Sequence, residues 1–64
     1  MNVTQKQVEE QIALACETAV LEDFPESRMA QIHNHVGYYQ GFCHAKEWIV
    51  NIDFVVRMIN LSRN

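Results

Sequence analysis

Apolar residues recur every three or four positions over the C-terminal half of the chain. They begin at Met29 and end at Leu61, and the spacing is broken once, around Lys46. Because an α-helix has about 3.6 residues per turn, this spacing places them on one helical face. The stripe consists of Met29, Ile32, Val36, Tyr39, Cys43, Val50, Phe54, Met58 and Leu61. The pattern predicts a long amphipathic helix and an all-α fold.

The N-terminal third contains the start signal and the apolar face of another helix. Thr4 is followed three residues later by Gln7, the pattern of a capping box. Apolar positions then follow at helical spacing, at Val8, Ile12, Ala15 and Ala19. We expect this first helix to run from about Gln5 to Glu22.

The strongest signal of a helix boundary in the chain is Asp23-Phe24-Pro25-Glu26. Pro25 suits the first turn of a helix, where its missing N–H costs nothing. Asp23 is predicted to cap this second helix, with Glu26 as its reciprocal partner. Because the connection is short, we expect the two helices to be antiparallel neighbours in a helical hairpin.

The segment after Lys46 fits two secondary structures. Val50, Ile52 and Phe54 alternate with other residues in a way that resembles a β-strand. However, the chain offers no second strand, and a single strand leaves its backbone groups unpaired. The helical spacing also continues to Leu61, so a helix is the preferred interpretation.

A chain of 64 residues forms one small domain, residues 1–64, in this interpretation. Such a chain buries only ~60% of the surface that its unfolded form exposes. Oligomerisation is one of the usual ways in which a core of this size is supplemented.

A helix over residues 24–62 would extend beyond the first helix, and its far half is apolar on nearly every side. Either it bends near Asn51, so that residues 51–62 fold back as a third helix, or it meets a second copy of the chain. No glycine or proline follows Gly41 to allow a sharp bend, which favours a homodimer. The predicted interface consists of Trp48, Val50, Phe54, Val55, Met58 and Leu61.

Residues 33–44, HNHVGYYQGFCH, concentrate side chains that bind metals. His33, His35, Cys43 and His44 are all zinc ligands by type. Ligands on one helix converge only at spacings of three or four, and no pair here has that spacing. Cys43 and His44 are sequence neighbours and point in different directions, so a cysteine–base pair is not predicted. We expect no metal, no cofactor and no enzymatic activity.

Gly37 and Gly41 lie four residues apart on one helical face. Each costs ~1 kcal/mol relative to alanine inside a helix. We interpret them as packing residues, which let the first helix approach closely or let a dimer partner cross. The competing interpretation is a break in the helix at Gly37. The continuous helix is preferred.

Tyr38, Tyr39 and Phe42 form an aromatic cluster beside the glycines. One interpretation places them in the core. The other is an exposed recognition patch for a protein partner, because tyrosine is a favoured binding anchor.

The charge pattern argues against nucleic acid as a partner. The net charge is −3, and the five cations are scattered singly rather than clustered. An acidic chain without visible chemistry is typical of a small interaction protein. The alternative is a helix-turn-helix DNA-binding regulator that presents Gln31 and Asn34 to base edges, although Arg28 is then the one cation near the start of that helix.

The sequence predicts neither a signal peptide nor a membrane span. The opening MNVTQKQVEEQ lacks a basic region followed by an apolar run. No apolar stretch approaches the ~20 residues that cross a bilayer. The two cysteines, Cys16 and Cys43, are too few for a disulfide scaffold. We expect a cytoplasmic protein with reduced thiols.

The chain resembles the small accessory proteins encoded between the exonuclease and excisionase genes of lambdoid bacteriophages. The likeness rests on MNVTQKQVEEQIALACE, on HNHVGYYQGFCHAKEWI and on the overall length. It implies a bacterial host cell as the setting, and a role in host takeover or in the balance between lytic and lysogenic growth. It assigns no function to an individual residue.

Overall fold

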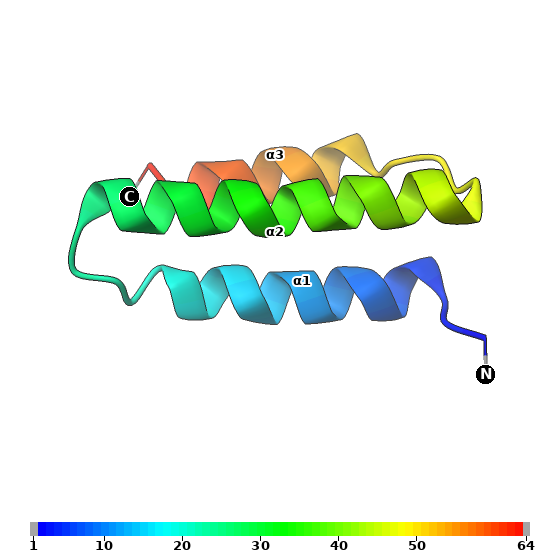
Figure 1. Ribbon diagram of the computed structural model, residues 1–64, viewed down its shortest axis with the longest axis horizontal. Helices are drawn as coiled ribbons and strands as arrows, with labels where there is room; N and C mark the ends of the chain where they lie inside the picture. The colour runs from blue at the N-terminus through cyan, green and yellow to red at the C-terminus, as the bar shows by residue number, and fades with distance from the viewer. Residues whose placement is uncertain (1, 64) are drawn as a thin grey trace.

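The computed structural model describes residues 2–63 and contains three helices. They are α1 (Gln5–Ala19), α2 (Pro25–Lys46) and α3 (Ile52–Leu61). Helices α1 and α2 lie antiparallel. Helix α3 runs back along α2 and is parallel to α1 (Figure 1). The all-α prediction is confirmed, and residues 52–61 are helical rather than a strand. Met1 and Asn64, the ends of the predicted domain, lie outside the described residues.

Helix α1 begins with the predicted capping box. The Thr4 hydroxyl accepts from the Gln7 backbone N–H at 3.1 Å, and the Gln7 side chain accepts from the Thr4 N–H at 2.9 Å. The helix ends at Ala19 rather than at Glu22, because the last turn tightens. There the N–H of Leu21 bonds to the Thr18 carbonyl at 3.1 Å, a three-residue spacing.

Helix α2 has Pro25 at its first position, as predicted, but Asp23 does not cap it. The residue before the helix is Phe24, whose backbone is extended and whose side chain makes no capping bond. Proline disfavours the helical conformation in the residue that precedes it, and this fixes Phe24 as the boundary. A side chain of α2 stabilises the turn between α1 and α2 instead. The Gln31 side chain donates to the Glu22 carboxylate at 2.5 Å.

Helix α2 continues through both glycines and ends at Lys46, after which the chain reverses. Glu47 adopts the left-handed conformation, with φ 59° and ψ 33°. Its N–H bonds to the His44 carbonyl at 3.2 Å, and the Trp48 N–H bonds to the Cys43 carbonyl at 2.9 Å. These two bonds form a Schellman motif, which normally has glycine at the left-handed position. The expectation that a reversal needs glycine or proline is therefore wrong.

We expect Glu47→Gly to stabilise the protein by about 0.5–1 kcal/mol, because glycine adopts the left-handed conformation without the strain that a Cβ imposes. Thermal unfolding followed by circular dichroism measures the change. Glu47→Ala is the matched control and should bring no gain, because alanine keeps the Cβ. Equal stability of the glycine and alanine variants would show that Glu47 is not strained.

Helix α3 folds back onto its own chain. The Asn51 side chain caps it by accepting from the Phe54 N–H at 3.2 Å. Three residues of its inner face are buried, with exposures of 2% for Phe54, 8% for Val55 and 7% for Met58. The core also contains Cys16, Ala19, Ile32, Val36, Tyr39 and Cys43. Of the two arrangements that the sequence allowed, the third helix is the one observed.

The predicted interface between copies therefore needs correction. Phe54, Val55 and Met58 fill the core of a single chain, so they are not available to a second copy in this fold. Trp48, Val50 and Leu61 are half-buried and pack against the same core. All six predicted interface residues therefore pack within the single chain, whereas Ile49, Ile52 and Val56 of the same segment remain exposed.

Candidate functional site

The aromatic cluster divides between the core and the surface. Tyr39 has no exposed area, whereas Tyr38 is 72% exposed and Phe42 is 39% exposed. The prediction of a recognition patch is therefore wrong for Tyr39, while Tyr38 and Phe42 are accessible. The division follows the helical period, because Tyr39 lies on the apolar stripe of α2 and Tyr38 lies beside it.

The Tyr39 hydroxyl links the three helices. It donates to the Glu9 carboxylate at 2.7 Å, and it accepts from the Gln5 side chain and from the Asn51 backbone N–H, each at 3.2 Å. The ring packs edge-on against Phe54, with centroids 5.0 Å apart. Burial, followed by the hydrogen bond to Glu9, raises the pKa of Tyr39 to about 12. These contacts give Tyr39 a structural role.

Gln5 completes this network from the start of α1. Besides Tyr39, its side chain donates to the Ile49 carbonyl at 2.7 Å. Its amide nitrogen also lies 3.9 Å from the Cys43 sulfur. The Gln5 side chain therefore connects the start of α1 to the segment between α2 and α3. This contact fixes the end of the hairpin that lies opposite the α1–α2 turn.

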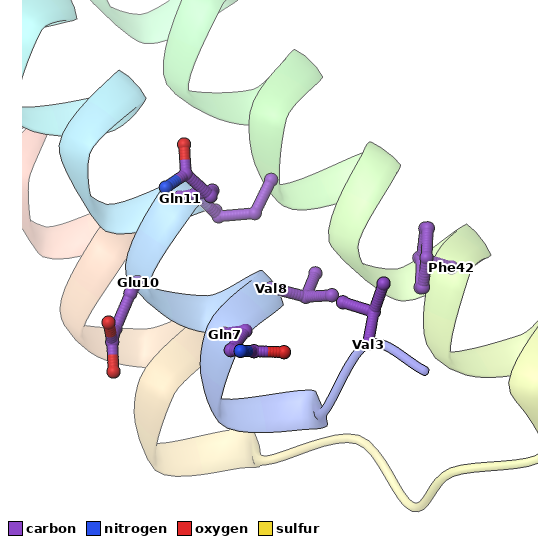
Figure 2. Close-up of a pocket in the computed structure, with 7 residues that line it drawn as sticks. Val3, Gln7, Val8, Glu10, Gln11 and Phe42 are labelled. Carbon is purple, nitrogen blue, oxygen red and sulfur yellow. The ribbon is translucent and has the colours of Figure 1, made fainter. Parts of the chain in front are cut away.

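A groove lies between α1 and α2 beside Phe42 (Figure 2). It encloses about 610 Å³. Its lining residues are Val3, Gln7, Val8, Glu10, Gln11, Ile12 and Phe42. The Phe42 ring is braced by Trp48, with centroids 5.8 Å apart, so the groove has a supported aromatic wall. We call this the α1/α2 groove.

The α1/α2 groove contrasts with the groove between α1 and α3. Glu10 is the one charged residue that lines the first, beside three apolar aliphatic side chains, one aromatic ring and two glutamines. The second encloses about 210 Å³ and is lined by Lys6, Glu9, Glu10, Ala13, Phe54 and Arg57. Predominantly apolar walls with a few polar groups favour the binding of an apolar side chain. The α1/α2 groove is therefore the better candidate for a protein contact.

Helix α2 is unusually poor in charge. Residues 29–45 contain no Asp, Glu, Lys or Arg, although the helix has an exposed side along its whole length. Protein surfaces normally carry charge at about 25–35% of positions. Depletion of charge together with exposed aromatic residues is the composition of interface cores. This run was visible in the sequence, and it is the signal that points to the α1/α2 groove and to α2.

Gly37 and Gly41 do not let α1 approach, contrary to that part of the prediction. A Cβ atom on either glycine would meet nothing within 4 Å outside the helix's own backbone in the described part of the chain. Both lie on the exposed side of α2, away from the core residues Ile32 and Tyr39. The idea that a second copy crosses there is independent of this correction.

The four candidate metal ligands lie in different surroundings. Cys43 is fully buried, His35 is half-buried, and His33 and His44 are exposed. Within residues 2–63, no group of three or more His, Cys, Asp or Glu side chains is placed to hold a metal ion. The other cysteine, Cys16, is also fully buried. Burial, followed by the nearby Glu17 carboxylate, raises the pKa of its thiol.

The three helices of residues 2–63 include none that is both long and apolar enough to cross a membrane. Comparisons of the chain with protein-family models, with curated proteins and with solved structures find no match. The functional interpretation therefore depends on the geometry of the surface.

Proposed function

We propose that this chain is a small interaction protein without catalytic activity, which acts as a homodimer and binds a host or phage protein. In this proposal it is an accessory factor of a lambdoid phage, present in the cytoplasm of the bacterial host. It influences host takeover or the balance between lytic and lysogenic growth. The phage setting rests on the resemblance of the sequence.

One observation carries the proposal of protein contacts. The α1/α2 groove is open and combines four apolar lining residues with Gln7, Glu10 and Gln11, and it lies beside a helix without Asp, Glu, Lys or Arg over residues 29–45. Protein interfaces combine these two properties, because an apolar pocket supplies binding energy and missing charge removes the cost of desolvation. Phe42 is braced by Trp48 and is therefore already positioned to receive a partner side chain.

The geometry gives less support to catalysis or DNA binding. The Cys43 thiol is fully buried, which keeps it from a substrate. In the alternative role as a DNA-binding helix, α2 would present Gln31 and Asn34 to base edges, with Arg28 as the nearby cation. Asn34 is exposed. Arg28 and Gln31 reach back to Glu22 instead, Arg28 at 3.4 Å to its carbonyl and Gln31 at 2.5 Å to its carboxylate.

Site-specific photo-crosslinking in the bacterial host tests the proposal. A benzophenone amino acid in place of Phe42 keeps an aromatic ring in the α1/α2 groove. The same amino acid in place of Val56, which is 51% exposed on α3, is the control. We expect a discrete adduct with one host or phage protein from position 42 and none from position 56. Adducts that are absent at position 42, or identical at both positions, would contradict the proposal.

A further inference from the structure

Negative charge is concentrated on α1 and on the turn that follows it. Residues 7–27 contain six carboxylates and no Lys or Arg. Residues 28–64 contain two carboxylates and four cations, so these two segments have net charges of opposite sign. The α1/α2 groove therefore has one wall from an acidic helix and one from a helix without Asp, Glu, Lys or Arg over residues 29–45.

Two carboxylates of α1 are exposed on the same side of the helix. Glu10 and Glu17 are seven residues apart, which is two helical turns, or about 10 Å along the axis. Leu14 lies between them and is 59% exposed. Glu9 differs, because its carboxylate accepts from the buried Tyr39 hydroxyl at 2.7 Å. The outer side of α1 thus offers an apolar side chain between two carboxylates, and we call these three residues the acidic ridge.

The acidic ridge begins at the rim of the α1/α2 groove. Val3 and Val8 are directed toward Phe42, whereas Glu10 projects from the far side of α1 (Figure 2). The groove therefore combines an apolar interior with a carboxylate at its outer edge. On the other wall, the Lys46 Nζ lies 5.9 Å from the centroid of the Phe42 ring. A cation of a binding partner would accordingly lie along α1, away from Lys46.

This distribution of charge defines the chemistry of a partner. Complementary charges orient a partner on an interface, and like charges placed together cost several kcal/mol. An apolar side chain suits the interior of the groove, and Lys or Arg side chains suit the acidic ridge. A second copy that presents its own α1 would bring the same carboxylates against it, and nucleic acid would bring phosphates.

We infer that the α1/α2 groove binds a basic segment of the partner protein. This segment inserts an apolar side chain beside Phe42 and places Lys or Arg over Glu10 and Glu17. The inference rests on the protein contact at the groove in the proposed function, and it names the chemistry of that contact.

The partner residues that cross-link to position 42 test the inference. Digestion of the adduct and mass spectrometry identify the segment that is joined to the benzophenone. We expect this segment to have a net positive charge within about seven residues on either side, which is two helical turns. A neutral or acidic segment would overturn the inference and leave the protein contact standing, and a segment of a second copy would overturn it too. Absence of an adduct would remove the proposed contact and the inference together.

Glu17→Lys, combined with the benzophenone at position 42, is the second test. Glu17 is exposed and does not line the groove, and a cation near the end of α1 suits the helix dipole, so the fold should be retained. We expect the yield of adduct to fall about 10-fold or more. Glu26→Lys, at the start of α2, changes the net charge equally and should keep the adduct.

Circular dichroism of the purified variants checks that each is helical. Should Glu17→Lys lose its helix signal, Glu17→Gln serves in its place, with a smaller fall in yield. An unchanged yield from the folded Glu17 variant, or an equal fall with Glu26→Lys, would overturn the inference.

Discussion

Phe54→Asp is expected to unfold the single chain. The ring is 2% exposed and packs edge-on against Tyr39, 5.0 Å away between centroids. Removing a buried phenylalanine costs about 3–5 kcal/mol, and a buried unpaired carboxylate adds to this. A core of this size rarely supplies more than ~3–5 kcal/mol in total. Far-UV circular dichroism should show loss of helix and no cooperative thermal transition.

Val56→Asp is the matched control for this prediction. Val56 lies two residues away on the same helix but is 51% exposed, so the same substitution should leave a folded, cooperative chain. The comparison also separates two uses of α3. If Phe54→Asp produced a folded monomer instead, Phe54 would be an interface residue and the intramolecular core described above would be wrong.

Tyr39→Phe is expected to lower the free energy of unfolding by about 1–3 kcal/mol, through loss of the hydroxyl alone. The Asn51 N–H and the Gln5 amide would each lose an acceptor, and the Glu9 carboxylate would lose a donor. For a domain of this size the melting temperature falls by about 4–8 °C per kcal/mol. Denaturant unfolding measures the change.

Tyr38→Phe is the control, because it removes the same atom from the neighbouring residue. At 72% exposure this change should alter stability by no more than about 0.5 kcal/mol. Equal effects of the two substitutions would show that the Tyr39 hydroxyl does not link the helices.

The raised pKa of Tyr39 also predicts that the stability of the fold depends on pH. Its pKa is raised from 10.0 to about 12, first by burial and then by the hydrogen bond to Glu9. Its contribution to stability is therefore complete below pH 10 and is lost as the pH rises toward 12, because the unfolded chain releases the proton first. The Tyr39→Phe variant should not show this part of the loss of stability at alkaline pH.

Local signals in the sequence were sufficient for the starts of the first two helices. Thr4 and Gln7 form a capping box whose partners are only three residues apart, and Pro25 can occupy few helical positions other than the first turn. The reversal after Lys46 was not predictable in this way. Glu47 takes a left-handed conformation that its residue type disfavours, and the Schellman hydrogen bonds together with the packing of α3 on the core compensate for it.

The apolar stripe predicts which residues of α2 are exposed as well as which are buried. At 100° per residue, Gly37 lies about 200° from Tyr39, so the stripe itself places the glycines opposite the core. It likewise separates Tyr38 from Tyr39. The α1/α2 groove could not be predicted, since it depends on the register of α1 against α2 and on Val3, which precedes the first helix.

Sedimentation equilibrium of the unmodified chain, over a wide range of concentration, tests the central claim most directly. The account predicts a folded species near twice the chain mass of 7.5 kDa, because the proposed function requires a homodimer. A mass of 7.5 kDa at every concentration would contradict the proposed homodimer.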